Sequence, residues 1–201
     1  MENNDNKLEM IKIGCFGESS VGKTCFARKY VKCESEFDLS TVGVEYFITN
    51  KTLSDGKKYK IKIYDTAGQE RYRSLCLGTI RGCDGIILMY DITRKNTFDL
   101  ISQWIENINQ LKENCPLVIV GNKCDLEDKR KVTKEEGLEI AKNYKTVYFD
   151  SSAKQGINVE NTFEELINRI IHNINLEKEK NVNIKLEKGK KNKQKKRGKF
   201  C

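Results

Sequence analysis

Short apolar runs along the chain have the length of β-strands. The runs at residues 85–91 and 116–122 are continuously apolar, which is typical of parallel strands covered on both faces. Residues 10–16 and 147–150 are two further strand candidates. Around an Asp-Gly pair, residues 52–65 carry alternating isoleucines, so we predict a β-hairpin there.

Between these runs, apolar residues recur at the spacing of one helix face. One stripe comprises Phe98, Ile101, Trp104, Ile105, Ile108 and Leu111, and another comprises Val159, Phe163, Leu166, Ile167, Ile170, Ile171 and Ile174. Helices that alternate with apolar strands predict an α/β fold with a mostly parallel sheet. Ligands of such folds bind at the carboxyl ends of the strands, so the loops there are the first candidates for a functional site.

Positive charge is concentrated at one end of the chain. The 201 residues have a formal net charge of +8, and the excess lies entirely within residues 188–201. The rest is neutral overall, whereas a nucleic-acid-binding domain usually carries positive charge on its folded docking surface. The apolar periodicity stops near residue 175. We therefore expect a flexible N-terminus at 1–7, one domain at 8–175 and a disordered polybasic tail at 176–201.

The termini and the cysteines suggest neither secretion nor a membrane span. Residues 1–12 lack the apolar run of a secretory signal, and no apolar stretch reaches the length of a bilayer span. The eight cysteines include no C-x-x-C pair, which argues against a zinc site and a disulfide framework. Instead we expect single buried thiols at Cys15, Cys25, Cys83 and Cys124.

The first predicted strand is followed by the pattern G-x-x-x-x-G-K-[ST]. Glycines in this pattern let backbone N–H groups surround a phosphate at the start of a helix. Lys23 would reach the outer phosphates, and the Thr24 hydroxyl would bind Mg²⁺. The predicted phosphate-binding residues are Gly17, Ser19, Ser20, Val21, Gly22, Lys23, Thr24 and Cys25.

The segment YDTAGQE, residues 64–70, ends the third predicted strand. Asp65 at this strand end can hold the metal through a water molecule, and the N–H of Gly68 can bind a γ-phosphate. Gln69 is placed to orient an attacking water rather than to deprotonate it. The segment therefore predicts that the bound triphosphate is hydrolysed.

Two later segments, NKCD at 122–125 and SSAK at 151–154, would recognise the base. The Asp125 carboxylate can accept hydrogen bonds from two donors of guanine that adenine lacks. The stem of Lys123 can lie over the base, and the N–H of Ala153 can bind the guanine carbonyl. The predicted guanine site comprises Asn122, Lys123, Asp125, Ser152, Ala153 and Lys154.

With these motifs in this order, residues 8–175 resemble the Ras superfamily of small GTPases. The segments STVGVEY, KIKIYDTAGQERYRSL, RGCDGIILMYDIT and NKCDL resemble its Rab (Ypt) branch. The resemblance implies a six-stranded P-loop NTPase fold, GTP or GDP with Mg²⁺ as ligands, and slow hydrolysis of GTP. It also implies that Thr41 binds Mg²⁺ and the γ-phosphate only in the GTP state, so that hydrolysis releases the loops at 34–46 and 66–80.

The resemblance further implies the partners of a molecular switch. We expect a guanine nucleotide exchange factor, a GTPase-activating protein, effectors, and a GDP-dissociation inhibitor or prenylation escort. No catalytic arginine is evident within the chain, so we expect the activating protein to supply one. The protein would be a monomer that works in vesicle trafficking, without nucleic acid, on the cytosolic face of an intracellular membrane.

Several positions differ from the Rab pattern. Tyr64 stands in place of the usual tryptophan and Thr79 in place of a tyrosine. Together with Tyr46 these residues would line the surface that effectors read, so the identity of the effector is open. Phe37 is the candidate for the aromatic residue that stacks on guanine.

Rab chains end in a flexible linker that carries prenylated cysteine, so we expect a lipid on Cys201. A prenyl chain and a polybasic segment together make a stable membrane anchor. However, a single final cysteine fits neither the C-a-a-X motif nor the two-cysteine Rab ending. The alternative is an unmodified tail that is attracted to membranes by charge alone.

Two other functions compete with the GTPase switch. A scaffold that binds GTP without hydrolysing it would carry the same binding motifs, but Thr41, Asp65 and Gln69 argue against it. A nucleic-acid-binding protein could use the basic tail. That tail lacks interleaved aromatic residues, Phe200 being the only one present.

Overall fold

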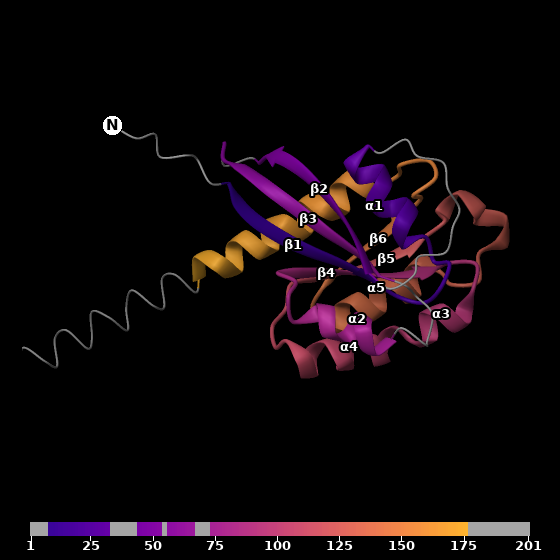
Figure 1. The fold of residues 1–201 in the computed structure, drawn as a ribbon. Helices are drawn as coiled ribbons and strands as arrows, with labels where there is room; N and C mark the ends of the chain where they lie inside the picture. Colours follow the sequence, from indigo (N-terminus) through magenta and orange to yellow (C-terminus); the bar gives the residue numbers. More distant parts are fainter. Residues whose placement is uncertain (1–7, 33–43, 54–55, 67–72, 177–201) are drawn as a thin grey trace, which may run out of the picture. The chain divides into compact units, whose positions relative to one another are not determined.

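A six-stranded sheet organises the computed structural model, which describes residues 8–32, 44–53, 56–66 and 73–176 (Figure 1). Its strands lie in the order β2-β3-β1-β4-β5-β6. Only β2 and β3 are antiparallel, and the other neighbouring pairs are parallel. The strands are β1 (Glu9–Phe16), β2 (Val44–Thr52), β3 (Lys58–Thr66), β4 (Gly85–Asp91), β5 (Leu117–Asn122) and β6 (Val147–Ser151). The predicted α/β fold with a mostly parallel sheet is confirmed.

Helices alternate with these strands, as the apolar stripes predict. They are α1 (Lys23–Val31), α2 (Arg73–Ile80), α3 (Lys95–Asp99), α4 (Ile101–Leu111), the 3₁₀ helix η2 (Cys124–Lys129) and α5 (Lys134–Asn143), followed by a helix at 159–176. The stripe that begins at Phe98 spans two helices rather than one. They meet at Leu100, whose N–H donates to the Phe98 carbonyl.

The chain divides into two compact units. The first, Met1–Ile167, holds the sheet, the labelled helices and the loops that carry the predicted site. In the second, Asn168–Cys201, the described residues 168–176 are helical. Of the predicted polybasic tail at 176–201, only Leu176 is described, as the end of this helix, and residues 177–201 lie outside the described part of the chain.

One hydrophobic cluster joins the sheet to α2, α4 and α5. Phe16 of β1, Leu88 of β4 and Ile119 of β5 are fully buried in it. Helix α4 contributes its predicted stripe, which includes Trp104 and Ile108. Burying each large side chain of this kind stabilises the fold by roughly 1.5–3 kcal/mol. The cluster therefore holds β1, β4 and β5 side by side, and their carboxyl ends meet at one edge of the sheet.

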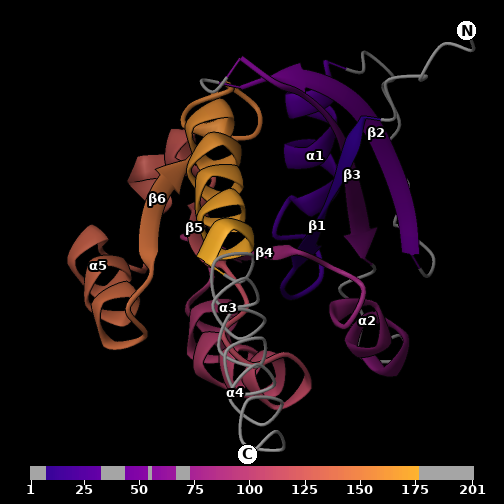
Figure 2. The ribbon, with the colours of Figure 1, turned by 90° about the vertical axis from the view of Figure 1, so that its left-hand side faces the viewer.

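A second set of apolar contacts holds α1, which lies beside β1 and β3 in Figure 2. The Tyr30 and Phe26 rings of α1 stack on Phe163, with ring centroids 3.8 and 5.7 Å away. On β3, Ile61 and Ile63 are fully buried, whereas Lys58, the first residue of the strand, is exposed. This packing fixes the start of α1 relative to the ends of the strands.

The cysteine predictions are partly confirmed. Cys15 and Cys83 are fully buried, and Cys124 is half-buried. The prediction for Cys25 is wrong, because this thiol is exposed. Helix α1 buries the stripe that contains Phe26, and Cys25 lies off that stripe.

Within the described ranges, none of the helices has both the length and the apolar character needed to cross a bilayer.

Candidate functional site

The loop between β1 and α1 is shaped by two glycines with positive φ. Gly17 has φ 132° and Gly22 has φ 100°. A Cβ atom on Gly17 would lie 2.1 Å from the Met89 carbonyl oxygen, and one on Gly22 would lie 2.3 Å from the Asn122 amide nitrogen. Any other residue at either position would therefore strain the backbone and collide with its neighbour. We call residues 17–24 the phosphate loop.

Lys23, the first residue of α1, extends along the inside of the phosphate loop. Lys23 is only 5% exposed to solvent. Its ammonium donates to the carbonyl oxygens of Gly17, at 2.9 Å, and Glu18, at 2.8 Å. The loop is thus wrapped around a positive charge at the amino end of a helix, which is an arrangement that binds anionic phosphate groups.

The next side chain, Thr24, meets the end of β3. Its hydroxyl donates to Asp65 Oδ2 at 2.6 Å, and Asp65 is fully buried. The neighbouring Thr66 hydroxyl donates to the Cys15 carbonyl at 2.7 Å, which ties β3 to β1 here. A hydroxyl and a carboxylate that lie together are the oxygen donors that Mg²⁺ prefers, so these two residues fit the predicted metal.

Asn122, the last residue of β5, connects two loops that are far apart in the sequence. Its side chain is 2% exposed. The amide nitrogen donates to the Val21 carbonyl of the phosphate loop at 2.8 Å, and the amide oxygen accepts from the Ala153 N–H at 3.0 Å. Both functional ends of the amide are therefore used to hold the two loops at fixed positions.

Asp125 of η2 is held by the loop after β6. Ser152 donates its hydroxyl to Asp125 Oδ1 at 2.6 Å, and the same hydroxyl accepts from the Gln155 N–H at 3.1 Å. This interaction orients the carboxylate beside Ala153. The Asp125 carboxylate is an acceptor that matches the donors of a guanine edge, whereas the Ala153 N–H beside it is donated to Asn122 Oδ1 in this structure.

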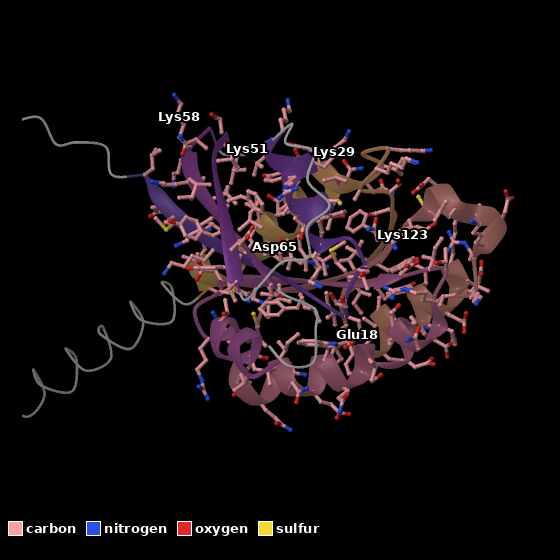
Figure 3. All side chains as sticks on the ribbon, turned by 45° about the vertical axis from the view of Figure 1, so that its right-hand side comes forward. Glu18, Lys29, Lys51, Lys58, Asp65 and Lys123 are labelled. Carbon is pink, nitrogen blue, oxygen red and sulfur yellow. The ribbon has the colours of Figure 1, made fainter. Side chains whose placement is uncertain are left out.

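Lys123 precedes Asp125 and adopts a left-handed backbone conformation, with φ 73°. Its ammonium forms an ion pair with Asp91 Oδ2 at 2.7 Å. Burial alone would raise the pKa of Asp91, but hydrogen bonds from Lys123 and Thr93 hold this pKa below its ordinary value. Figure 3 marks Lys123 together with Glu18 and Asp65, which belong to three different segments of the site.

Comparison with known proteins agrees with this geometry. A model of the Ras family matches residues 12–172. The chain belongs to the Ras family. Ras-related protein Rab-8B of Bos taurus is 41% identical over 170 residues, which cover 83% of this chain and 81% of the relative. Ras-related protein Rab-8A of Bos taurus is 43% identical over 161 residues, which cover 78% of this chain and 76% of the relative.

This Ras-family chain is a Rab-like small GTPase. It binds GTP and GDP with Mg²⁺, hydrolyses GTP and acts as a switch in membrane trafficking, with regulators and effectors. The resemblance and the enzyme class predicted from the sequence are therefore confirmed. The assignment of individual site residues stays a prediction, and several of them lie outside the described residues: Phe37, Thr41, Gly68, Gln69 and Cys201.

The structure brings together the remaining predicted residues of this Rab-like GTPase. Most lie on the phosphate loop, at the end of β5 or in the loop after β6. Ser20 is exposed and has a positive φ of 60°, which is uncommon for a residue with a side chain. Lys154 is also exposed.

Two contacts to the phosphate loop were not predicted from the sequence. The Trp104 indole N–H donates to Glu18 Oε1 at 3.0 Å. The Arg94 guanidinium donates to the Ser19 carbonyl at 2.7 Å. An arginine therefore touches the phosphate loop from within the chain, although no sequence motif marks it. Both residues are far from the loop in sequence, so only tertiary packing could identify them.

A half-buried polar network lies beside residues 122–125, the predicted base-recognition loop. Arg130, which follows η2, donates to Asp150 of β6 at 2.7 Å. The Tyr148 hydroxyl also donates to Asp150, at 2.8 Å, and accepts from Tyr90 at 3.2 Å. Burial raises the pKa of Tyr90 to about 12. The network connects β4, β6 and the turn that follows Asp125.

The predicted effector surface carries an additional charge. Tyr46 and Tyr64 pair across β2 and β3, and Tyr46 is 59% exposed. The Lys62 ammonium lies 4.0 Å from the Tyr46 ring centroid and 4.9 Å from that of Tyr64. Thr79 of α2 is half-buried. This surface therefore combines aromatic rings with a cation rather than presenting apolar groups alone.

Proposed function

We propose that the phosphate loop and the loops after β3, β5 and β6 form the guanine nucleotide site of this GTPase switch. One observation carries the proposal: Asn122 bonds both to Val21 of the phosphate loop and to Ala153 of the loop after β6. In the sequence, Asn122 is 101 positions from Val21 and 31 positions from Ala153. A phosphate-binding segment and a base-binding segment are thereby held as one site.

Each group of residues has a separate task in this proposal. Gly17, Ser19, Ser20, Val21, Gly22, Lys23, Thr24 and Cys25 bind the phosphates, and Asn122, Lys123, Asp125, Ser152, Ala153 and Lys154 bind guanine. Thr24, Thr41 and Asp65 hold Mg²⁺, which neutralises charge on the phosphates. Gly68 binds the γ-phosphate, and Gln69 orients the attacking water.

The switch itself depends on residues that contact the γ-phosphate. Thr41 and Gly68 each lose a partner when GTP becomes GDP, so the segments that contain them are released together. An effector that binds those segments distinguishes the two states. A guanine nucleotide exchange factor reloads GTP, and a GTPase-activating protein supplies the catalytic arginine for hydrolysis.

The C-terminal tail places the switch on a membrane in this proposal. Prenylation of Cys201 and the basic residues of 188–201 act together, because one lipid chain alone binds a bilayer only marginally. Each basic residue near an anionic surface adds about 1 kcal/mol. A GDP-dissociation inhibitor or prenylation escort would cover the lipid, and the protein would lie on the cytosolic face of an intracellular membrane as a monomer.

The base site is tested with Asp125→Asn and a matched control, Asp128→Asn. Asp128 lies on the same 3₁₀ helix but is exposed. In competition with labelled GDP, Asp125→Asn should lose guanine affinity by about 100-fold or more and gain affinity for xanthine nucleotides, because a carboxylate acceptor is replaced by an amide donor that matches the extra carbonyl of xanthine. Asp128→Asn should match the wild type. An unchanged guanine preference in Asp125→Asn would refute the assigned base site.

A further inference from the structure

Asp91, the last residue of β4, lies between the phosphate loop and the base-recognition loop. Its side chain is 1% exposed. Asp91 Oδ2 accepts from Lys123 Nζ at 2.7 Å and from Arg94 Nε at 3.0 Å. The same guanidinium then donates from its outer nitrogen to the Ser19 carbonyl at 2.7 Å. A continuous chain of contacts thus joins Lys123 to Ser19.

We propose that Arg94 is a positioning residue of the phosphate loop, and that Asp91 holds it in place. The inference rests on the proposed nucleotide site, because it concerns the loop that binds the phosphates there. Arg94 acts on the backbone of the loop rather than on the nucleotide. It is therefore distinct from the arginine that an activating protein contributes.

The position of Asp91 is set by contacts on both carboxylate oxygens. Oδ1 accepts from the Thr93 N–H at 2.9 Å and from the Thr93 hydroxyl at 2.7 Å. Oδ2 accepts the two cations, Arg94 and Lys123. Since all of these donors favour the charged form, the carboxylate is an anchor with a fixed orientation.

Arg94 is held at its backbone as well as at its side chain. Its N–H donates to the Asp91 carbonyl at 2.9 Å. Its own carbonyl accepts from the Thr97 hydroxyl at 2.7 Å. A guanidinium is planar and rigid, so fixing Nε on Asp91 also fixes the direction in which the outer nitrogen points. That direction is toward the carbonyl of Ser19.

The hold on Ser19 determines where the next N–H points. In a trans peptide, the carbonyl of one residue and the N–H of the following residue point in opposite directions, and the described residues contain no cis peptide. When Arg94 binds the Ser19 carbonyl, the Ser20 N–H must point away from Arg94. Ser20 has φ 60°, a conformation that costs energy for a residue with a side chain. Arg94 thus stabilises a conformation that Ser20 would not otherwise favour.

The chain offers a matched control beside Arg94. Lys95 is the next residue and also carries a positive charge, but it pairs with Glu136 of α5. Its ammonium lies 4.6 Å from the Phe98 ring centroid. Removing the Lys95 charge leaves the contact to Ser19 in place. Any effect that is specific to Arg94→Ala therefore reflects the contact to the loop and not the loss of a cation from this segment.

The test compares the full-length wild type with Arg94→Ala, Arg94→Lys and Lys95→Ala. The release of fluorescent GDP is measured by stopped flow, and GMP is used as a competitor because it lacks the β-phosphate. Arg94→Ala should release GDP about tenfold faster, since a hydrogen bond from a charged donor is lost and Arg94 is partly exposed. Its affinity for GMP should stay within about twofold of wild type, because the base site is intact.

The lysine variant separates geometry from charge. Lysine keeps the positive charge near Asp91 but lacks the planar fork that reaches two acceptors, so Arg94→Lys should release GDP nearly as fast as Arg94→Ala. The proposal would be overturned if Arg94→Ala released GDP no faster than Lys95→Ala. It would also be overturned if Arg94→Lys released GDP at the wild-type rate. An equal loss of GMP and GDP affinity in Arg94→Ala would overturn it as well. Wild-type protein that binds no GDP would instead contradict the proposed nucleotide site itself.

If Arg94→Ala does not fold, Arg94→Lys decides the question. GMP binding then shows that the lysine variant is folded, and its GDP release rate is compared with that of Lys95→Ala. Faster release supports the positioning role, and an equal rate refutes it.

Discussion

Asp91 and Asn122 face each other as the final residues of β4 and β5. Both side chains reach the phosphate loop by different routes. Asn122 bonds directly to the Val21 carbonyl, whereas Asp91 acts through Arg94 on the Ser19 carbonyl. Two adjacent strand ends therefore hold two carbonyls of the same loop, which couples the shape of the loop to the sheet.

Replacing Asn122 by alanine should weaken the binding of guanine nucleotides. The change leaves the Val21 carbonyl and the Ala153 N–H without their buried partner, at a cost of about 1–3 kcal/mol each. We expect weaker binding of both GDP and GMP, because both loops are affected. Equilibrium titration with the two nucleotides measures this.

Asn122→Asp is the matched variant for that experiment. A carboxylate keeps an acceptor for the Ala153 N–H but cannot donate to the Val21 carbonyl. Its affinity should also fall. An affinity equal to wild type in either variant would contradict the role of Asn122 as a link between the two loops.

Loss of the Thr24 hydroxyl should make nucleotide release insensitive to Mg²⁺. In wild-type protein, chelation of Mg²⁺ by EDTA should accelerate GDP release by roughly tenfold or more, the effect of disturbing a metal site. Thr24→Ala should release GDP quickly with or without EDTA, since its contact with Asp65 is also lost. The rate measured in both conditions checks the prediction. An EDTA response as large as that of wild type would place the metal elsewhere.

Replacement of Gln69 by leucine should slow hydrolysis while leaving GTP binding intact. Leucine cannot orient a water molecule, so single-turnover hydrolysis should fall about tenfold or more. Quantifying GDP by chromatography after mixing with GTP gives the rate. The same rate in both proteins would remove the role assigned to Gln69, and the absence of turnover in wild type would favour the GTP-binding scaffold.

The buried thiol of Cys83 should resist alkylation in the folded protein. Burial, with a smaller contribution from neighbouring Cys115, raises the pKa of Cys83 to about 12, so little thiolate is present at pH 8. Labelling by iodoacetamide, followed by peptide mapping, should be at least about 100-fold slower than in urea-unfolded protein. Rapid labelling of folded protein would show that the site opens readily.

The same shift predicts how stability responds to alkaline pH. The pKa of Cys83 is higher in the folded state than its ordinary value of 9.0. Its contribution to stability is therefore fully present below about pH 9 and is lost as the pH rises toward 12. The free energy of unfolding in urea should fall over that interval. Cys83→Ala should show a smaller fall.

Mass analysis of the C-terminal peptide after expression in eukaryotic cells tests the membrane anchor. We expect a prenyl-sized increase in mass on Cys201, and none on the peptide of Cys201→Ser. An unmodified peptide in the wild type would leave only the charge of residues 188–201 to attract a membrane. Binding to anionic vesicles would then decrease steeply with salt.

The sequence predicted those parts of the site that depend on local motifs. The placement of the phosphate loop, Asn122, Asp125 and Ala153 at one edge of the sheet could be predicted because each lies just after an apolar run, and the carboxyl ends of parallel strands share one edge. Their roles in nucleotide binding stay predictions. The strand positions followed from the same runs. The one-helix interpretation of 98–111 was less accurate, because apolar spacing does not reveal the interruption at Leu100.

Contacts that depend on tertiary packing could not be predicted. Arg94 lies 75 positions from Ser19 in the sequence, and its direction depends on Asp91 and on the start of α3. The exposure of Cys25 depends on which face of α1 meets the sheet, and the short motif around it does not contain that information. Such side chains could be assigned only after the strands and helices were placed.

The links through Asn122 and Arg94 affect how binding energy would be divided within a nucleotide. If guanosine and pyrophosphate were offered as separate fragments, each would bind to its own loops while the loops for the other fragment are already held in position. A covalent connection between the fragments then spares the second one the entropy of a separate encounter. The association constant of GDP should consequently exceed the product of the association constants of the two fragments. Removing the contact made by Asn122 or by Arg94 should reduce this excess before it reduces the affinity of either fragment alone.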